Sequence, residues 1–462
     1  MRFAEKNQKK NRRGGATRVI AVGFLVAILL GTLLLMLPFA TKEGKSTSWS
    51  DALFTAVSCT CVTGLSVFDT ATHWSIFGQS VMMVLIQVGG LGFMTLAVLL
   101  SWLFRRSVTP RERMLVAASY NLNSFESIQE LVKRIIFGTL IIEGAGAVLL
   151  FTRFVTICDS IPSAIYKSVF TAISAFCNAG FDVAGDLPGA GEGTSLSLFV
   201  ADPMVNITLI VLILFGGIGF FVWNDFAVCV KNRTKRKLRP YTLFVLYITA
   251  ILTVGGSIFF AVTEWNNPAT IGNFSVGNKI LASVFHTVSL RTAGFYTVNN
   301  ADMSSASKVL STVYMFIGGA SGSTAGGVKL VTVGVVIVTV WSVFVGKEDT
   351  VLFGRSISRD TFLRAVSVVI IQFAVICISV ILMVVWTDFG LTQVVYEAVS
   401  AVSTVGLSLG ITADLALNGR IVLIILMYFG RVGVLTVSYA VLSHVGGQEP
   451  AVRYPDADFL IG

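Results

Sequence analysis

The residues best suited to chemistry in this chain are four glycines, each at the end of one copy of a short motif. A copy has an aromatic residue, three further residues and a serine; five or six positions after the serine comes a glycine, followed by an apolar residue. Glycine adopts backbone dihedrals that β-branched residues resist, so it can turn the carbonyl groups around it toward one side. Rings of such carbonyls can replace the hydration shell of a cation. The motif therefore predicts a cation site built from main-chain oxygens. The glycines are Gly64, Gly180, Gly294 and Gly406.

The predicted ligands are the carbonyl oxygens of each glycine and of the two residues before it. Side chains at these positions differ between the four copies, which favours main-chain oxygens over a ring of side chains. The alternative, that the segments are only structural turns, is disfavoured by their recurrence at intervals of 116, 114 and 112 residues. The twelve residues are Val62, Thr63, Gly64, Asn178, Ala179, Gly180, Thr292, Ala293, Gly294, Thr404, Val405 and Gly406.

The composition indicates what kind of protein must hold these segments. Of the 462 residues, 54% are hydrophobic and 13% are charged, and the mean hydropathy is +0.80. A soluble domain is about 25% charged. The composition therefore excludes a soluble enzyme, a secreted disulfide scaffold and a disordered chain, and it indicates a polytopic membrane protein.

Apolar runs of two lengths alternate along the chain. Eight of them are long enough, at about 20 residues or more, to span a bilayer as helices. Four shorter runs of 10–13 residues contain the motif and are predicted to be re-entrant half-helices, which occur where the backbone lines a cavity. The long runs are 19–41, 75–104, 135–154, 203–230, 240–263, 309–346, 365–387 and 421–446, and the short runs are 50–60, 164–176, 278–290 and 392–402.

Each long–short–long unit is one repeat, and two spans per repeat give all four repeats the same orientation. The predicted fold class is an all-α polytopic membrane protein with four tandem helix–pore loop–helix repeats around one central pore. Small residues cluster in each second span, at 89–92, 216–219, 318–321 and 430–433, where they allow helices to pack closely. The predicted units are a basic tail (1–18), repeat 1 (19–106), an amphipathic linker (107–134), repeat 2 (135–239), repeat 3 (240–346), a linker (347–360), repeat 4 (361–446) and a tail (447–462).

The net charge of +9 is interpreted as membrane topology rather than as a sign of a nucleic-acid partner. With the N-terminus in the cytosol, 24 of the 34 Lys and Arg residues lie in cytosolic segments, eight lie on the opposite face and two lie within spans. Cytosolic loops of membrane proteins carry such an excess. Both termini are therefore expected in the cytosol. Residues 124–134 fit either an amphipathic helix on the membrane surface or an extension of the next span.

The motifs together resemble those of the Trk/Ktr/HKT superfamily of potassium transporters, and most of all its Ktr-type membrane subunits. The resemblance covers essentially the whole chain, and it rests on the four glycines, on the run Arg291-Thr292-Ala293-Gly294-Phe295 and on a glycine-rich stretch in the third repeat. A single helix before Gly64 favours the Ktr type. Plant-type relatives that prefer sodium have serine in place of the first glycine, so the resemblance implies K⁺ as the substrate here.

The resemblance also implies partners and a location. It implies a homodimer in the lipid bilayer of the plasma membrane, together with a separate cytosolic ring of nucleotide-binding regulatory subunits (KtrA-like). The chain itself has no nucleotide-binding motif, and no organic cofactor is expected in it. Whether Na⁺ is coupled to transport stays open. Because each loop has a single glycine, we expect only modest discrimination of K⁺ over Na⁺.

Two features within the spans are interpreted as a gate. Ten small residues interrupt 309–346, and their five glycines each cost a helix up to about 1 kcal/mol. The resemblance implies a movable loop below the filter, and a static kink is the alternative. Arg431 lies in the last span, where a charge normally faces a cavity. The resemblance implies that it forms a barrier to cations, and snorkelling or pairing with a buried acid is the alternative. The ten residues are Gly318, Gly319, Ala320, Ser321, Gly322, Ser323, Thr324, Ala325, Gly326 and Gly327.

Three other charged residues are assigned structural roles. Arg291 would repel a cation if it pointed to the axis, so it is expected behind the filter, paired with an acid such as Glu397. Glu143 is interpreted as a scaffold partner rather than as an ion ligand. An intramembrane enzyme would need clustered His, Cys, Asp or Glu residues, which the spans lack, and a receptor scaffold would not need four glycine loops. The sequence therefore favours a transporter over both.

Overall fold

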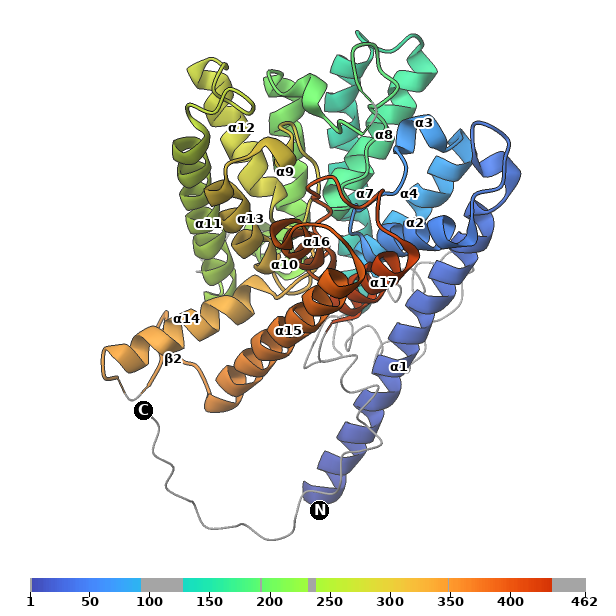
Figure 1. Ribbon diagram of the computed structural model, residues 1–462. Coiled ribbons are helices and arrows are strands. Elements are labelled where there is room, and N and C mark those ends of the chain that lie inside the picture. Colours follow the sequence, from blue (N-terminus) through green and yellow to red (C-terminus); the bar gives the residue numbers. More distant parts are fainter. Residues whose placement is uncertain (1, 93–127, 192, 232–237, 348, 434–462) are drawn as a thin grey trace.

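The computed structural model describes residues 2–92, 128–191, 193–231, 238–347 and 349–433, and Figure 1 shows a bundle made almost entirely of helices. The first two repeats contain α1 (Arg2–Leu35), η1 (Pro38–Ala40), α2 (Trp49–Cys61), α3 (Thr70–His73), α4 (Ile76–Leu91), α7 (Ile128–Phe154), α8 (Ile161–Cys177), η2 (Ser197–Phe199), α9 (Pro203–Gly217) and α10 (Phe220–Lys231). The last two contain α11 (Pro240–Glu264), α12 (Val276–Ser289), η3 (Asn300–Asp302), α13 (Ser305–Phe316), α14 (Leu330–Phe344), α15 (Arg359–Trp386), α16 (Leu391–Ser403) and α17 (Leu417–Val432), and the antiparallel strands β1 (Val351–Leu352) and β2 (Arg355–Ser356) lie between them.

The four short helices α2, α8, α12 and α16 form within three residues of the predicted short runs. Three of them begin at a serine whose hydroxyl accepts a hydrogen bond from a first-turn amide, which supplies one of the partners that a helix N-terminus lacks. These serines are Ser48, Ser160 and Ser275. The last two turns of all four helices are largely buried, so each points its C-terminus into the bundle.

The core consists mainly of two large apolar clusters that join neighbouring repeats. One packs side chains of the first repeat against the second, and includes Trp74, Phe176 and Phe199. The other packs the first repeat against the fourth, and includes Phe54, Tyr396 and Met427. Because the first repeat takes part in both clusters, the chain closes on itself instead of forming an open row.

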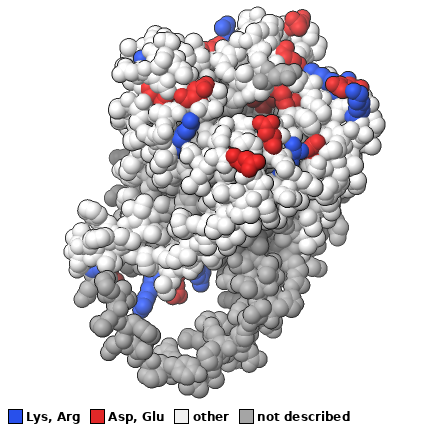
Figure 2. All heavy atoms as spheres, in the orientation of Figure 1, with Lys and Arg blue, Asp and Glu red and all other residues white. Residues whose placement is uncertain are grey.

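Apolar helices of membrane-spanning length occur where three of the eight long runs were predicted. In the described part of the chain they are Val132–Phe154, Pro240–Glu264 and Arg359–Trp386. Their outer faces are exposed and apolar, and Val385 on α15 is 73% exposed. Figure 2 shows a broad band almost free of charged side chains between the charged upper and lower ends of this face. This distribution suits a surface that contacts lipid.

The span predicted over 203–230 consists of two helices rather than one. Helices α9 and α10 are bent by 93° at the small residues between them. The physical reason is the last glycine of the cluster, Gly219, whose φ of +91° ends a right-handed helix. Helices α4 and α17, in the runs 75–104 and 421–446, end directly before Gly92 and Gly433, and both glycines have positive φ.

The predicted break in 309–346 lies where the sequence placed it. Backbone without helix, residues 317–329, separates α13 from α14, and an isolated parallel bridge between Ile317 and Val328 brings its two ends together. In Figure 1, α14 leaves the bundle and runs alongside α15.

Several predicted segments lie partly or wholly outside the described residues. Residues 128–134 are continuous with α7, so the described part of 124–134 follows the span-extension interpretation rather than a separate surface helix. Residues 107–127, the end of the 421–446 run and the 447–462 tail lie outside the described residues.

Candidate cation site

The four motif glycines lie next to one another and form a closed ring. A Cβ added to Gly64 would lie 2.5 Å from the carbonyl oxygen of Ala179, which precedes the glycine of the second repeat. The same relation leads from each repeat to the next: Gly180 faces the Ala293 oxygen (2.9 Å), Gly294 faces the Val405 oxygen (2.5 Å), and Gly406 faces the Thr63 oxygen, which closes the ring. The structure therefore brings together one glycine and one preceding carbonyl from every repeat.

Each glycine of this ring is required for two independent reasons. All four have φ between +72° and +95°, a region that L-residues enter at a cost of roughly 1–2 kcal/mol. In addition, any side chain would overlap a carbonyl oxygen of the next repeat. A substitution here therefore changes both the backbone and the space around the carbonyl groups.

Positive φ also occurs two positions before each glycine, which the residue types there did not indicate. Val62, Asn178, Thr292 and Thr404 have φ values of 58°, 58°, 66° and 52°. Such a conformation is uncommon for residues other than glycine and is a marked outlier for the β-branched Val62, Thr292 and Thr404, at a cost of about 1–3 kcal/mol per residue. The surrounding hydrogen bonds must offset this cost in all four repeats.

Each motif serine binds the loop that follows it, a role that was not predicted from the sequence. The serine carbonyl accepts a hydrogen bond from the amide of the residue before the glycine in every repeat, over 2.8–2.9 Å. The four pairs are Ser58 with Thr63, Ser174 with Ala179, Ser289 with Ala293, and Ser400 with Val405. The amide before each glycine is thus bonded to the short helix of its own repeat. The recurrence of serine at the same position of every motif is the sequence feature that could have predicted these bonds.

The small-residue clusters of the second helices pack against the short helices. A Cβ on Gly89, Gly216 or Gly430 would overlap a carbonyl at the end of the short helix in the same repeat. Glycine therefore lets the second helix approach that carbonyl, which is the packing role expected from the sequence. In the third repeat the corresponding Gly318 faces Gly326 of its own loop instead.

The loop 317–329 is held largely by main-chain bonds to the second repeat. The amides of Ala320 and Thr324 donate to Gly217 and Gly216 over 2.9 and 3.2 Å, and the loop carbonyl of Gly322 accepts from Phe220 over 2.8 Å. The bend between α9 and α10 exposes the groups that make these bonds. The break in the second repeat and the loop of the third repeat thus form one hydrogen-bonded unit.

Arg431 connects three repeats. Its guanidinium donates to the Thr324 carbonyl of the loop and to the carbonyls of Gly89 and Gly90, the latter over 3.3 Å, in the small-residue cluster of the first repeat. Lys329, at the other end of the loop, donates to the Ala325 carbonyl over 2.7 Å. Both charges therefore bind the backbone of the loop or its neighbours.

The predicted ion pair between Arg291 and Glu397 is wrong. Arg291 is buried, and its guanidinium donates to the Thr249 hydroxyl of α11 over 3.4 Å. Glu397 accepts a hydrogen bond from Thr412 in its own repeat. The two side chains point to different surroundings because each is held by a partner close to its own loop, which residue types alone could not show.

Glu143 lies between two repeats, behind the second loop. Its carboxyl accepts from the Gln87 side chain of α4 over 3.1 and 3.2 Å, and Cys177, the last residue of α8, donates its thiol to Gln87 over 3.2 Å. Glu143 is buried. Its bonds with Gln87 connect the first span of the second repeat to the second helix of the first repeat.

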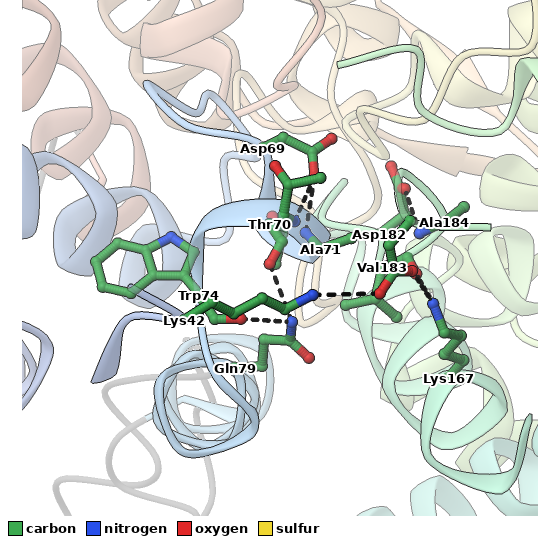
Figure 3. A network of polar contacts seen from close by, with 12 residues as sticks. Lys42, Asp69, Thr70, Ala71, Trp74, Gln79, Lys167, Asp182, Val183 and Ala184 are labelled. Carbon is green, nitrogen blue, oxygen red and sulfur yellow. Dashed lines mark hydrogen bonds and ion pairs between the residues drawn. The ribbon is translucent and has the colours of Figure 1, made fainter. Parts of the chain in front are cut away.

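Polar contacts hold the segments that follow the first two glycines, and Figure 3 shows those around Asp69 and Lys167. Asp69 accepts from the amides of Ala71 and Thr72, and its second oxygen accepts from the amide of Gly193 in the neighbouring repeat, over 2.9 Å. Lys167 donates to the Val183 carbonyl over 2.8 Å and forms an ion pair with Asp186. These bonds hold the segments that follow Gly64 and Gly180 in place.

The fold and this ring define a class: a helical membrane protein in which four short helices end at one ring of backbone. The chain belongs to the TrkH cation transport protein family, whose model matches residues 2–445.

Curated relatives match over nearly their whole length. The chain is 36% identical to the potassium/sodium uptake protein NtpJ of Enterococcus hirae, over 98% of this chain and 99% of that protein. It is 37% identical to the Ktr system potassium uptake protein B of Bacillus subtilis, over 96% of each. These proteins are named as transporters, in agreement with the predicted family and against a membrane enzyme.

A solved structure shares the fold. The potassium transporter TrkH of Vibrio parahaemolyticus superposes with a TM-score of 0.67 at 19% sequence identity, over 90% of this chain and 84% of that one. The all-helical membrane fold is therefore that of TrkH.

Proposed function

We propose that this chain carries K⁺ across the plasma membrane, with the ring of backbone carbonyls as its selectivity filter. The observation that carries the proposal is the closed ring of Gly64, Gly180, Gly294 and Gly406, each beside a carbonyl oxygen of the next repeat. Carbonyl oxygens at fixed spacing can replace the water ligands of K⁺. Four short helices also end there, and their C-terminal dipoles favour a cation. The relatives named for potassium uptake support K⁺ as the substrate.

The ring is also consistent with modest selectivity. Each loop contributes one glycine and one adjacent carbonyl to the ring described above, so few layers of oxygens are available to discriminate between ions. Na⁺ is therefore the competing ion to test, and one relative is named for the uptake of both ions. The proposal leaves coupling to Na⁺ open.

The loop 318–327 and Arg431 are proposed to act as the gate. The loop carries no regular structure, and Arg431 holds it through the Thr324 carbonyl. A guanidinium beside the ion path raises the energy of a cation there. Because Arg431 is bonded to the loop, movement of the loop would change the height of this barrier.

The proposed assembly follows the resemblance of the sequence to Ktr-type subunits. Both termini are proposed to lie in the cytosol, two copies of the chain to form a dimer, and a ring of nucleotide-binding regulatory subunits to contact its cytosolic segments. Two of the curated relatives are named Ktr system potassium uptake protein B, which supports a system of several components.

Transport in cells tests the function. A bacterial strain without its own K⁺ uptake systems, producing this chain, should grow at low external K⁺ and accumulate the ion, whereas the same strain with an empty vector should not. Normal insertion into the membrane without K⁺ or Na⁺ uptake, both alone and with a regulatory partner, would overturn the proposal.

A further inference from the structure

The four motif serines contact the ring through their hydroxyl groups as well as through their carbonyls. All four are fully buried, and each hydroxyl bonds to the backbone of the glycine or of the residue after it. The bonds are not alike in the four repeats. Since a peptide group is planar and trans, its N–H and C=O point in opposite directions. The group that each serine holds therefore decides which carbonyl faces the ring.

In the first and fourth repeats the serine accepts a hydrogen bond from the glycine itself. The amide of Gly64 donates to the Ser58 hydroxyl over 3.1 Å, and the amide of Gly406 donates to the Ser400 hydroxyl over 3.1 Å. The carbonyl of Thr63 shares a peptide group with the Gly64 amide and so points away from the helix. It lies against Gly406, where the ring is closed.

In the second repeat the bond is shifted by one residue. The amide of Phe181 donates to the Ser174 hydroxyl over 3.1 Å. By the same argument, the carbonyl of Gly180 points away from the short helix. This serine thus orients a carbonyl one position further along the loop than Ser58 and Ser400 do.

The third repeat reverses the direction of the bond. The Ser289 hydroxyl donates to the carbonyl of Phe295, the residue after Gly294. That carbonyl therefore points toward the short helix and away from the axis. The cause lies in the sequence, because this loop is one residue shorter, with five positions from Ser289 to Gly294 where the other repeats have six.

We infer that the motif serines are positioning residues for ion selectivity and that the filter is chemically unequal among its repeats. Ser58, Ser174 and Ser400 hold carbonyls toward the ion, whereas Ser289 withdraws the Phe295 carbonyl from it. The inference rests on the proposed function, since it assigns a role in selectivity to groups beside the proposed filter. It predicts that the same substitution has different consequences in different repeats.

Alanine substitutions test the inference, with the purified full chain and its binding of K⁺ and Na⁺ measured by titration calorimetry. Ser58→Ala and Ser400→Ala each remove one acceptor from a buried amide, which should lower the ratio of K⁺ to Na⁺ affinity about three- to tenfold. Ser289→Ala releases a carbonyl that does not face the ion, so the affinity for K⁺ should stay within roughly twofold. Ser58→Thr, which keeps the hydroxyl, should restore the ratio.

Two other buried serines serve as matched controls. Ser168 in α8 and Ser283 in α12 donate to carbonyls of their own helices, over 2.6 and 2.7 Å. Ser168→Ala and Ser283→Ala should leave the ratio unchanged. If Ser58→Ala does not purify as a single species, the ratio is measured with Ser400→Ala.

The possible failures are distinguishable. A parent protein that binds K⁺ no better than Na⁺ would contradict the proposed filter itself. A parent protein that prefers K⁺, with Ser58→Ala and Ser400→Ala unchanged or with the controls equally affected, would overturn the role of the serines alone.

Discussion

The loops of the glycine ring and the loop 317–329 are both irregular backbone inside the bundle, but they are anchored differently. Each ring loop is tied to the short helix of its own repeat, as in the bond from the Thr63 amide to the Ser58 carbonyl. The loop 317–329 is tied to other repeats, through Gly216 and Gly217 of the second and Arg431 of the fourth.

The difference in hydrogen bonding indicates which of these loops can change conformation. A loop bonded within its own repeat keeps its geometry when repeats shift relative to one another. A loop bonded to several repeats must rearrange when they shift, because its partners move apart. We therefore expect the ring loops to set selectivity and the loop 317–329 to set flux, and the following substitutions test this division.

The largest expected effect is on selectivity, from Gly64→Ser. The side chain would meet the Ala179 carbonyl and strain a residue with φ of +95°, so the ratio of K⁺ to Na⁺ transport should fall at least about tenfold. Flux of K⁺ and Na⁺ into liposomes measures the ratio. Gly44→Ser is the matched control, because Gly44 also has positive φ but has open space around it. Equal effects of both substitutions would contradict the role of the ring.

The next effect is on flux, from Arg431→Ala. Loss of the guanidinium removes a positive charge and its charged hydrogen bonds to the carbonyls of Thr324, Gly89 and Gly90. Flux without a regulatory partner should therefore rise at least about tenfold while the K⁺ to Na⁺ ratio stays constant. Flux into liposomes through the unactivated protein is the measurement. Unchanged or lower flux would count against a gate at Arg431.

A smaller effect is expected from Thr324→Val. The Thr324 hydroxyl donates to the Phe176 carbonyl over 3.1 Å and joins the loop to the second repeat. Loss of one such bond is worth about 1 kcal/mol, which corresponds to roughly a fivefold rise in unactivated flux. Ser323→Ala is the control, since within the described part of the chain the Ser323 hydroxyl bonds to Ala320 of the same loop, over 2.6 Å. If both variants raise flux equally, anchoring to another repeat is not what holds the loop.

The sequence predicted much of this fold because the repeated motif carries its own register. The aromatic residue, serine and glycine recur together, so the four short helices were placed within three residues of their observed ends. The break at 317–329 was also predictable, because ten small residues in a row cannot hold a helix.

The missed features depend on contacts between residues far apart in the chain. The bend between α9 and α10 follows a Gly-Gly-Ile-Gly run, and such a run allows either close packing or a helix end; the amides that complete the bend come from 320 and 324. The partner of Arg291 could not be predicted because it is set by the direction of the side chain, which brings the guanidinium to the Thr249 hydroxyl in α11. The hydrogen bonds of the motif serines depend on the path of each loop, and the third loop follows a different path because it is one residue shorter.

The most direct test is to locate the ion. Crystals of the protein grown with Tl⁺ in place of K⁺ would show the bound cation by its anomalous scattering. The account predicts a peak on the axis of the ring, within coordination distance of the carbonyl oxygens of Thr63, Ala179, Ala293 and Val405. A fully occupied peak elsewhere in the protein, with none at the ring, would contradict the account.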